Sequence, residues 1–274
     1  MAQIKEVIPN AFVFTLGNEV VHGRVVNTNA SYLGRRLSIL GFNVLGNISL
    51  IDDIKLISYF LNLVIKKFKP VVIITTGGLG PTYDDRTLEA VALATGKKLV
   101  INQDALRSVK EKYERAGLEL TEDRLKMTYL PEGAIAIPNY VGTAPGSWLE
   151  LPNEKSIIIS LPGVPKELTE MWEKWVEPRL STISPKKFMY ETKILIEGVP
   201  ESTLAPILKE IVRTYGDVYV KSHPKGHETR KPIIEIYIMT YAESKEKAKE
   251  MVDEVKEKIL DLLMNKGIKF NVVK

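Results

Sequence analysis

The chain has 274 residues, a net charge of +4, 45% hydrophobic residues, 26% charged residues and no cysteine. This composition is typical of a globular protein, and it excludes disulfides, zinc–thiolate sites and cysteine nucleophiles. The charge is small for a dedicated nucleic-acid binder, the first residues lack the apolar core of a signal peptide, and no apolar run is long enough to span a membrane, so we expect a cytoplasmic protein.

The first 180 residues alternate strand and helix patterns. Strands are predicted over 11–17, 42–50, 71–76, 132–138, 147–151 and 156–160, with helices over 27–41, 52–68, 86–96 and 106–116 and another after the loop 162–167. This alternation predicts a three-layer α/β fold with a mostly parallel sheet covered on both faces. Ligands of such sheets bind at the carboxyl ends of the strands, so the loops of interest are 17–29, 49–53, 77–86 and 162–167.

The composition changes over 178–187 (PRLSTISPKK), which we interpret as a linker between a domain at 1–180 and a second at 188–274. The second domain is predicted as an α+β sandwich with strands over 188–198, 217–224 and 232–242 and helices over 200–216 and 243–265. Its basic run, 221–231, contains His223 and His227. Pro224 and Gly226 between them argue against a metal-binding helix and favour a solvated loop.

The stretch TTGGLGPTYDDRTLEA begins at Thr75 and follows a predicted buried strand. Gly77, Gly78 and Gly80 allow a ligand to approach the main chain, whose N–H groups can bind phosphate oxygens. Asp84 and Asp85 would then meet the same phosphate only through a cation such as Mg²⁺. The loop alone is equally consistent with a tight turn in which Asp85 caps the next helix and Asp84 is solvated. The chain contains no P-loop, dinucleotide fingerprint or G-x-S-x-G elbow.

The loop after the first strand carries three polar candidates. Glu19 can bind a metal or ribose hydroxyls, and Asn27 and Asn29 can hydrogen-bond a base, a ribose or a phosphate. Alternatively, Asn27, Thr28 or Asn29 caps the following helix, and we expect at least one of the three to do only that.

Two more loops end at the same predicted sheet edge. Asp52 and Asp53 follow the second strand, where one is expected to cap a helix and the other is free for a metal or substrate. In LPGVPKE, 161–167, Lys166 can face a phosphate and Glu167 a metal. A turn followed by a solvated first helical turn is the alternative for both.

Together these segments resemble the CinA family (competence/damage-inducible protein A). GNEVVHGRVVNTNASYL, TGGLGPTYDDRT, LPEGA, PNYVGTAPG and LPGVPKE occur in the order and spacing of that family, over roughly residues 8–180. The resemblance implies the molybdopterin-biosynthesis fold of MoaB and MogA, followed by a KH-like domain. It also implies hydrolysis of ADP-ribose to AMP and ribose 5-phosphate with a divalent metal, Mg²⁺, Mn²⁺ or Co²⁺.

The resemblance assigns Asp85 to chemistry at a phosphate and Asp52 to a second acidic position. The expected site residues are, for catalysis, Asp85, Asp84 and Asp52; for substrate and phosphate binding, Gly77, Gly78, Gly80, Thr82, Glu19, Asn27, Asn29, Gly163 and Lys166; and, for the metal, Asp84, Asp85 and Glu167.

Departures from the family pattern limit these expectations. Longer members carry a nicotinamide-mononucleotide deamidase domain that this sequence does not contain, so we expect no deamidation. Position 18 is Asn where relatives often have Thr or Asp, and the KH-like segment has no G-x-x-G turn. The alternatives are a molybdopterin-binding or adenylyl-transferring protein of molybdenum-cofactor synthesis, and a non-catalytic RNA-binding module around 221–231. We expect a homodimer, because the small C-terminal sheet needs a partner.

Overall fold

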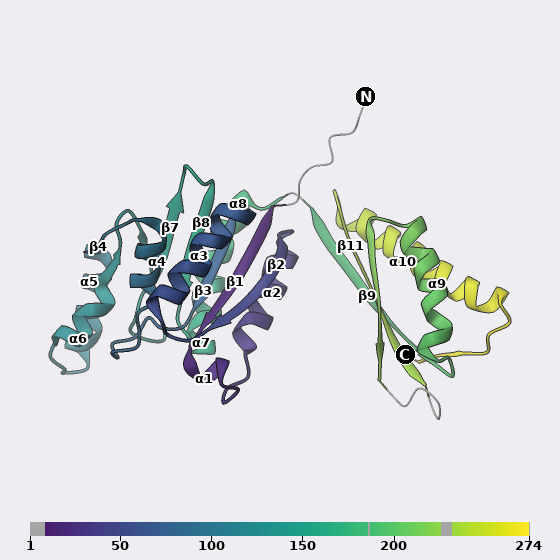
Figure 1. The fold of residues 1–274 in the computed structure, drawn as a ribbon, viewed down its shortest axis with the longest axis horizontal. Helices are drawn as coiled ribbons and strands as arrows, with labels where there is room; N and C mark the ends of the chain where they lie inside the picture. The colour runs from purple at the N-terminus through teal and green to yellow at the C-terminus, as the bar shows by residue number, and fades with distance from the viewer. Residues whose placement is uncertain (1–8, 186, 226–231, 274) are drawn as a thin grey trace. The chain divides into compact units, whose positions relative to one another are not determined.

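The computed structural model describes residues 9–185, 187–225 and 232–273. The chain divides into two compact units, one containing Phe42–Pro185 with most of the preceding residues and the other containing the described residues after 186 (Figure 1). The prediction of a linker over 178–187 is wrong for most of that stretch. Helix α8 (Glu177–Ile183) extends through it, and its Leu180 is fully buried in the first unit.

The larger unit is built on a six-stranded sheet in the order β2-β1-β3-β8-β7-β6. The first four strands are parallel, and β7 and β6 pair antiparallel at one edge. The predicted mostly parallel α/β sheet is therefore confirmed. Its strands are β1 (Asn10–Leu16), β2 (Asn43–Leu50), β3 (Val72–Thr76), β6 (Ile135–Ile137), β7 (Gly146–Leu151) and β8 (Ser156–Leu161).

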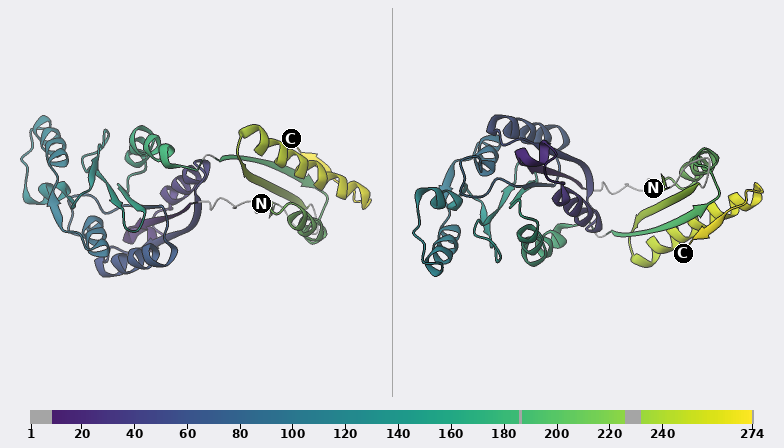
Figure 2. Two further views of the ribbon diagram at one scale, coloured as in Figure 1. Left: turned by 90° about the horizontal axis from the view of Figure 1, so that it is seen from above. Right: turned by 90° about the horizontal axis from the view of Figure 1, so that it is seen from below.

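Helices cover both faces of this sheet (Figure 2). The α-helices of this unit are α1 (Asn18–Val21), α2 (Thr28–Ile39), α3 (Ile54–Phe68), α4 (Thr87–Thr95), α5 (Gln103–Arg115), α6 (Glu122–Leu125), α7 (Pro165–Met171) and α8. Every residue of β3 is buried, as expected of an apolar central strand with helices on each side. A separate antiparallel pair, β4 (Leu99–Ile101) and β5 (Tyr129–Pro131), was not predicted.

Local capping sets where several helices begin and end. Asp53 is the N-cap of α3, and its side chain accepts a hydrogen bond from the Leu56 N–H at 2.7 Å. Gly96 ends α4 in the left-handed conformation, with φ of 65°. The expected cap in the SLIDD segment is therefore Asp53, which leaves Asp52 for other contacts.

The smaller unit is an α+β sandwich, as predicted. Its elements are β9 (Phe188–Glu197), α9 (Glu201–Thr214), β10 (Val218–Pro224), β11 (Ile233–Ala242), α10 (Lys245–Asn265) and β12 (Asn271–Val273), and the antiparallel sheet has the order β10-β11-β9-β12. This is the split βαβ connectivity of ferredoxin-like folds, completed by a strand, β12, that was not predicted. His227 and residues 226–231 of the basic run lie outside the described residues. No helix in the described part of either unit is both long and apolar enough to cross a membrane.

Candidate functional site

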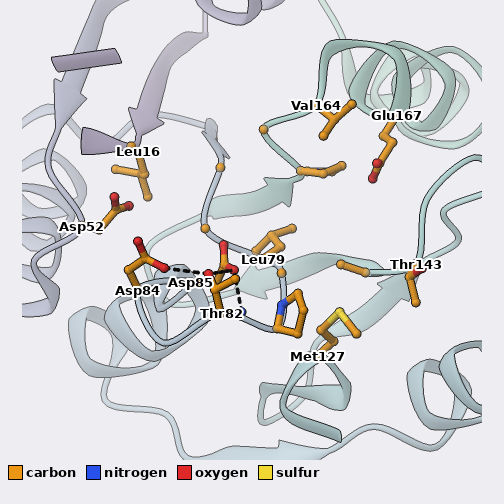
Figure 3. Close-up of a pocket in the computed structure, with 18 of the residues that line it drawn as sticks. Leu16, Asp52, Leu79, Thr82, Asp84, Asp85, Met127, Thr143, Val164 and Glu167 are labelled. Atoms are coloured by element: carbon orange, nitrogen blue, oxygen red, sulfur yellow. Dashed lines mark hydrogen bonds between the residues drawn. The ribbon is translucent and has the colours of Figure 1, made fainter. Parts of the chain in front are cut away.

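A cavity of about 600 Å³ lies beyond the carboxyl ends of β1, β3 and β8 (Figure 3). Each of the four loops selected from the sequence contributes to its wall. The lining residues are Leu16, Gly17, Glu19, Asp52, Gly77, Gly78, Leu79, Gly80, Pro81, Thr82, Asp84, Asp85, Tyr113, Met127, Thr143, Ala144, Pro162, Gly163, Val164, Pro165 and Glu167. The site therefore has the position at which α/β sheets bind ligands.

The backbone of the glycine-rich loop packs directly against the backbone of neighbouring segments. Gly77 has φ of +103°, and a Cβ there would lie 2.0 Å from the Leu16 carbonyl oxygen, so no larger residue fits without backbone movement. A Cβ on Gly163 would lie 3.3 Å from the Gly77 Cα, which places the two glycine loops in contact. The N–H groups of Gly78, Leu79 and Gly80 donate to no acceptor among the described residues. Three consecutive donors at the cavity wall suit an anion.

Two carboxylates converge on Thr82 at the end of this loop (Figure 3). The Thr82 hydroxyl lies 2.6 Å from Asp84 Oδ1 and 2.5 Å from Asp85 Oδ2, and the Thr82 N–H donates to Asp85 Oδ2 at 2.9 Å. Helix α4 begins after Arg86 without a side-chain cap, so the alternative in which Asp85 caps that helix is wrong. The hydrogen bond from Thr82 holds the pKa of Asp84 below its ordinary value, and the charge of Lys126 acts in the same direction.

Asp52 lies on the side of the Asp84–Asp85 pair that faces away from Glu167 (Figure 3). Its Oδ2 accepts a hydrogen bond from the Asn18 backbone N–H at 3.0 Å, which fixes the start of α1. Burial raises the pKa of Asp52, against the lowering effect of that hydrogen bond, and the charges of Glu19, Asp84 and Asp85 raise it further. Glu19 is exposed at the rim, with Oε1 2.5 Å from where a Cβ on Gly17 would stand. One end of the cavity is thus strongly acidic.

Asn27 and Asn29 are used by the protein itself. Asn27 Oδ1 accepts from the Ala30 N–H at 3.0 Å, which is the geometry of a cap for α2, and its amide donates to Thr15 and Ser49. Asn29 is buried, and its amide donates to Thr76 Oγ1 at 3.0 Å and to the Gly163 carbonyl at 2.8 Å. Neither asparagine lines the cavity. Their observed contacts position the loops around the site.

Lys166 and Glu167 are adjacent in the chain and differ in placement. Lys166 is exposed and outside the cavity lining, so the structure does not bring it to the expected phosphate position. Glu167 lines the cavity, where its Oε2 accepts from the Asn139 side-chain amide at 2.7 Å. Within the described residues, no three Asp, Glu or His side chains are gathered closely enough to hold a metal. Asp84, Asp85 and Glu167 therefore do not form the expected three-carboxylate cluster, and of the three only Asp84 and Asp85 share a contact, the Thr82 hydroxyl.

Several residues of the site were not identified from the sequence. Leu79, Tyr113 and Met127 give the lining its apolar part. Lys112, on α5, donates to the carbonyl oxygens of Asn139 and Gly142, and burial lowers its pKa. A lysine on an amphipathic helix gives no sequence signal for such a role, because most are solvated.

Known proteins are similar either to the first unit or to nearly the whole chain. A model of a probable molybdopterin binding domain matches residues 12–182. A protein from Metallosphaera sedula is 43% identical over 257 residues, covering 94% of this chain and 95% of that one, and a protein from Aeropyrum pernix is 44% identical over 88% of each. The crystal structure of a CinA protein of unknown function from Thermoplasma acidophilum is similar to 62% of this chain and 98% of its own, with 38% identity and a TM-score of 0.58.

Proposed function

The chain belongs to the CinA family, and on that premise we propose that its cavity hydrolyses the phosphoanhydride bond of ADP-ribose or a related nucleotide diphosphate with the aid of a divalent metal. The products are AMP and a sugar phosphate. One observation carries the proposal: the carboxylates of Asp84 and Asp85 converge on a single hydroxyl beside three backbone N–H groups that have no acceptor in the part of the chain that the structure describes.

The electrostatics of that convergence favour a cation between the carboxylates and a bound phosphate. The Thr82 hydroxyl has one proton, so it can donate to only one of the two carboxylates that it contacts. Glu19 and Asp52 add negative charge at the same end of the cavity. A phosphate entering against these groups would be repelled, whereas a divalent cation between carboxylates and phosphate turns the repulsion into attraction.

The carboxylate oxygens of this site suit a hard cation that is bound by the protein and by the substrate phosphate together. Mg²⁺ is commonly bound through one or two carboxylates together with substrate phosphate oxygens, and Asp84 and Asp85 provide those carboxylates. When bound, the metal would neutralise phosphate charge and polarise a phosphoryl oxygen.

The chain's own groups supply the remaining chemistry. The N–H groups of Gly78, Leu79 and Gly80 can donate to phosphoryl oxygens as negative charge develops on them. Asp52 holds the Asn18 N–H through Oδ2, which leaves Oδ1 to accept a proton from an attacking water. The new bond joins the water oxygen to phosphorus, and the bond from phosphorus to the bridging oxygen breaks. Leu79, Tyr113 and Met127 provide an apolar surface for the base.

Product analysis tests the proposal. Purified protein is incubated with ADP-ribose and Mg²⁺, Mn²⁺ or Co²⁺, and AMP is measured by chromatography. We expect AMP with at least one metal, none with EDTA, and a loss of about 100-fold or more in Asp85→Asn. Asp104→Asn removes the same charge from an exposed position on α5 and serves as the matched control. The absence of AMP with every metal would overturn the proposal.

A second candidate is binding of molybdopterin or adenylyl transfer to it. It is supported by the match of residues 12–182 to a probable molybdopterin binding domain, and the same apolar surface would accept a pterin ring. This candidate predicts saturable molybdopterin binding together with no release of AMP from ADP-ribose. The two assays therefore separate the candidates.

A further inference from the structure

Glu167 presents a carboxylate across the cavity from the acidic pair. Figure 3 shows Met127 and Thr143 on the same side as Glu167, with Asp52, Asp84 and Asp85 on the other. One carboxylate oxygen, Oε2, accepts from Asn139, and the other, Oε1, has no hydrogen bond within the described part of the chain. Among those residues Glu167 forms no salt bridge, although its charge raises the pKa of Lys112 against the lowering effect of burial. Glu167 therefore lines the cavity as an acceptor with one oxygen unused.

The loop that follows β6 is built around this carboxylate. Asn139 is 2% exposed, and its side chain makes four hydrogen bonds. Its Nδ2 donates to Glu167 and to the Ala144 carbonyl, and its Oδ1 accepts from the N–H groups of Val141 and Gly142. A loop arranged to direct one amide at one carboxylate holds that carboxylate in a fixed orientation.

Two further contacts support the same arrangement. A Cβ on Gly142 would lie 2.2 Å from Glu167 Oε2, so a larger residue there would push the carboxylate out of its observed position. Lys112 donates to the carbonyl oxygens of Asn139 and Gly142 and thereby ties the loop to α5. Asn139, Gly142 and Lys112 act as positioning residues, because they meet the ligand only through Glu167.

The chemistry of this acceptor limits what it can bind. An ionised carboxylate accepts hydrogen bonds and repels anions, so it favours hydroxyl groups and disfavours phosphate. Among the described residues, Glu167 belongs to no group of three Asp, Glu or His side chains that could hold a metal. If phosphates occupy the glycine loop and the base lies on Leu79, Tyr113 and Met127, the group beside Glu167 is the ribose of the nucleoside.

We propose that Glu167 recognises the vicinal hydroxyls of the adenosine ribose and excludes ligands that carry a phosphate at that ribose. This rests on the proposed function, because it takes the ligand to be a nucleotide with its phosphate chain at the glycine loop. Oε1 of Glu167 accepts hydrogen bonds from the ribose hydroxyls, while Asn139 holds Oε2. A phosphate at the 2′ position would therefore lie against the negative carboxylate and be repelled by it. The site thereby selects an unphosphorylated ribose.

Calorimetry with three non-hydrolysable probes, AMP, 2′-deoxy-AMP and adenosine 2′,5′-bisphosphate, tests this in the presence of Mg²⁺. We expect the wild-type protein to bind AMP about 10-fold more tightly than either of the others. In Glu167→Gln the new amide oxygen can still accept the hydrogen bond from Asn139. The amide NH₂ group of the glutamine, a donor, then faces the ribose in place of Oε1. AMP should then bind about 10-fold more weakly and the bisphosphate at least as tightly as AMP, which reverses the order of affinities.

Two more variants complete the test. Glu167→Asp keeps the charge but shortens the side chain, so it should lose the preference for AMP over 2′-deoxy-AMP while still rejecting the bisphosphate. Glu170→Gln removes the same charge from the same helix, outside the cavity lining, and should leave all three affinities unchanged. Thermal unfolding confirms that each variant is folded.

The outcomes separate this inference from the proposed function. A folded Glu167→Gln protein that keeps the wild-type ratio of AMP to bisphosphate affinity overturns the role of Glu167, and so does a wild-type protein that does not bind AMP. If Glu167→Gln does not fold, a Glu167→Asp protein that still prefers AMP to 2′-deoxy-AMP overturns it. A wild-type protein that shows the expected selectivity but releases no AMP from ADP-ribose overturns the hydrolysis alone.

Discussion

Asn29 and Gly163 are separated by 134 residues, and the Asn29 side-chain amide donates a hydrogen bond to the Gly163 carbonyl oxygen at 2.8 Å. The same amide donates to Thr76 Oγ1 at 3.0 Å. One buried side chain on α2 thus joins the end of β3 to the loop after β8. Asn29 therefore holds the loops at the cavity wall in place, although it does not line the cavity itself.

Replacing this asparagine should weaken the whole unit. Asn29→Ala leaves the Gly163 carbonyl without its donor in a partly buried setting, so we expect the free energy of unfolding to fall by about 2 kcal/mol. Urea unfolding followed by circular dichroism measures the change. Asn153→Ala, at an exposed position in the turn after β7, is the matched control and should leave the midpoint unchanged. Equal midpoints for both variants would contradict the structural role of Asn29.

Two glycines of the same loop should respond differently to alanine. In Gly80→Ala the new Cβ would lie 2.7 Å from Asp85 Oδ2, the end of a side chain that can move away. We expect a melting temperature close to that of the wild type and at least about a 10-fold loss of hydrolysis, because the displaced carboxylate leaves its position.

Gly77→Ala places its Cβ against the Leu16 backbone at a positive φ, so the strain falls on the fold itself. We expect a loss of about 3 kcal/mol in the free energy of unfolding. Thermal unfolding and hydrolysis rates of the two variants, measured side by side, check both expectations. A Gly80→Ala protein as destabilised as Gly77→Ala would show that Asp85 is held rigidly by the fold.

Asp52 should make stability depend on pH. Burial raises the pKa of Asp52, so the folded state binds its proton more readily than the unfolded state does. The ionisation of Asp52 therefore reduces stability as the pH rises from about 4, the ordinary range of aspartate, through the raised pKa. Asp52→Asn removes this penalty while its side-chain oxygen can still accept from Asn18. We expect a higher Tm than the wild type at about pH 7, no difference at about pH 3, and slower hydrolysis.

Thermal unfolding across that pH range is the measurement for Asp52. Asp104→Asn, at an exposed position, should shift Tm little at either pH. A gain from Asp52→Asn that is the same at both ends of the range would show that the stabilisation does not come from removing a charge.

The alternation of strands and helices brought the four selected loops to the edge where the cavity lies, because the ends of buried parallel strands such as β3 meet at one edge of a sheet. Helix caps were also readable: Asp53 and Asn27 occupy the expected positions, and Gly96 ends α4. The strands that were missed, β4, β5 and β12, have three residues each, which leaves little alternation to read, although β6, of the same length, was found within 132–138.

Side-chain roles within the site were harder to predict. Asn27 and Asn29 have the chemistry of ligand contacts, but their partners Thr15, Thr76 and Gly163 become neighbours only when the sheet forms. Glu167 was assigned to a metal because its loop ends at the correct edge, and only the cavity shows that it stands apart from Asp84. Sequence reasoning places loops at an edge but does not determine which side chains converge there.

The most direct test of the account is a titration with Mn²⁺, with and without AMP. Because the proposed site offers the cation two carboxylates, those of Asp84 and Asp85, the protein alone should bind Mn²⁺ weakly, and the phosphate of AMP should tighten binding by about 10-fold or more. Asp84→Asn should abolish that gain, which separates the site from the binding of Mn²⁺ by AMP in solution. An affinity for Mn²⁺ that is the same with and without AMP would contradict the claim that the cation lies between the carboxylates and the phosphate.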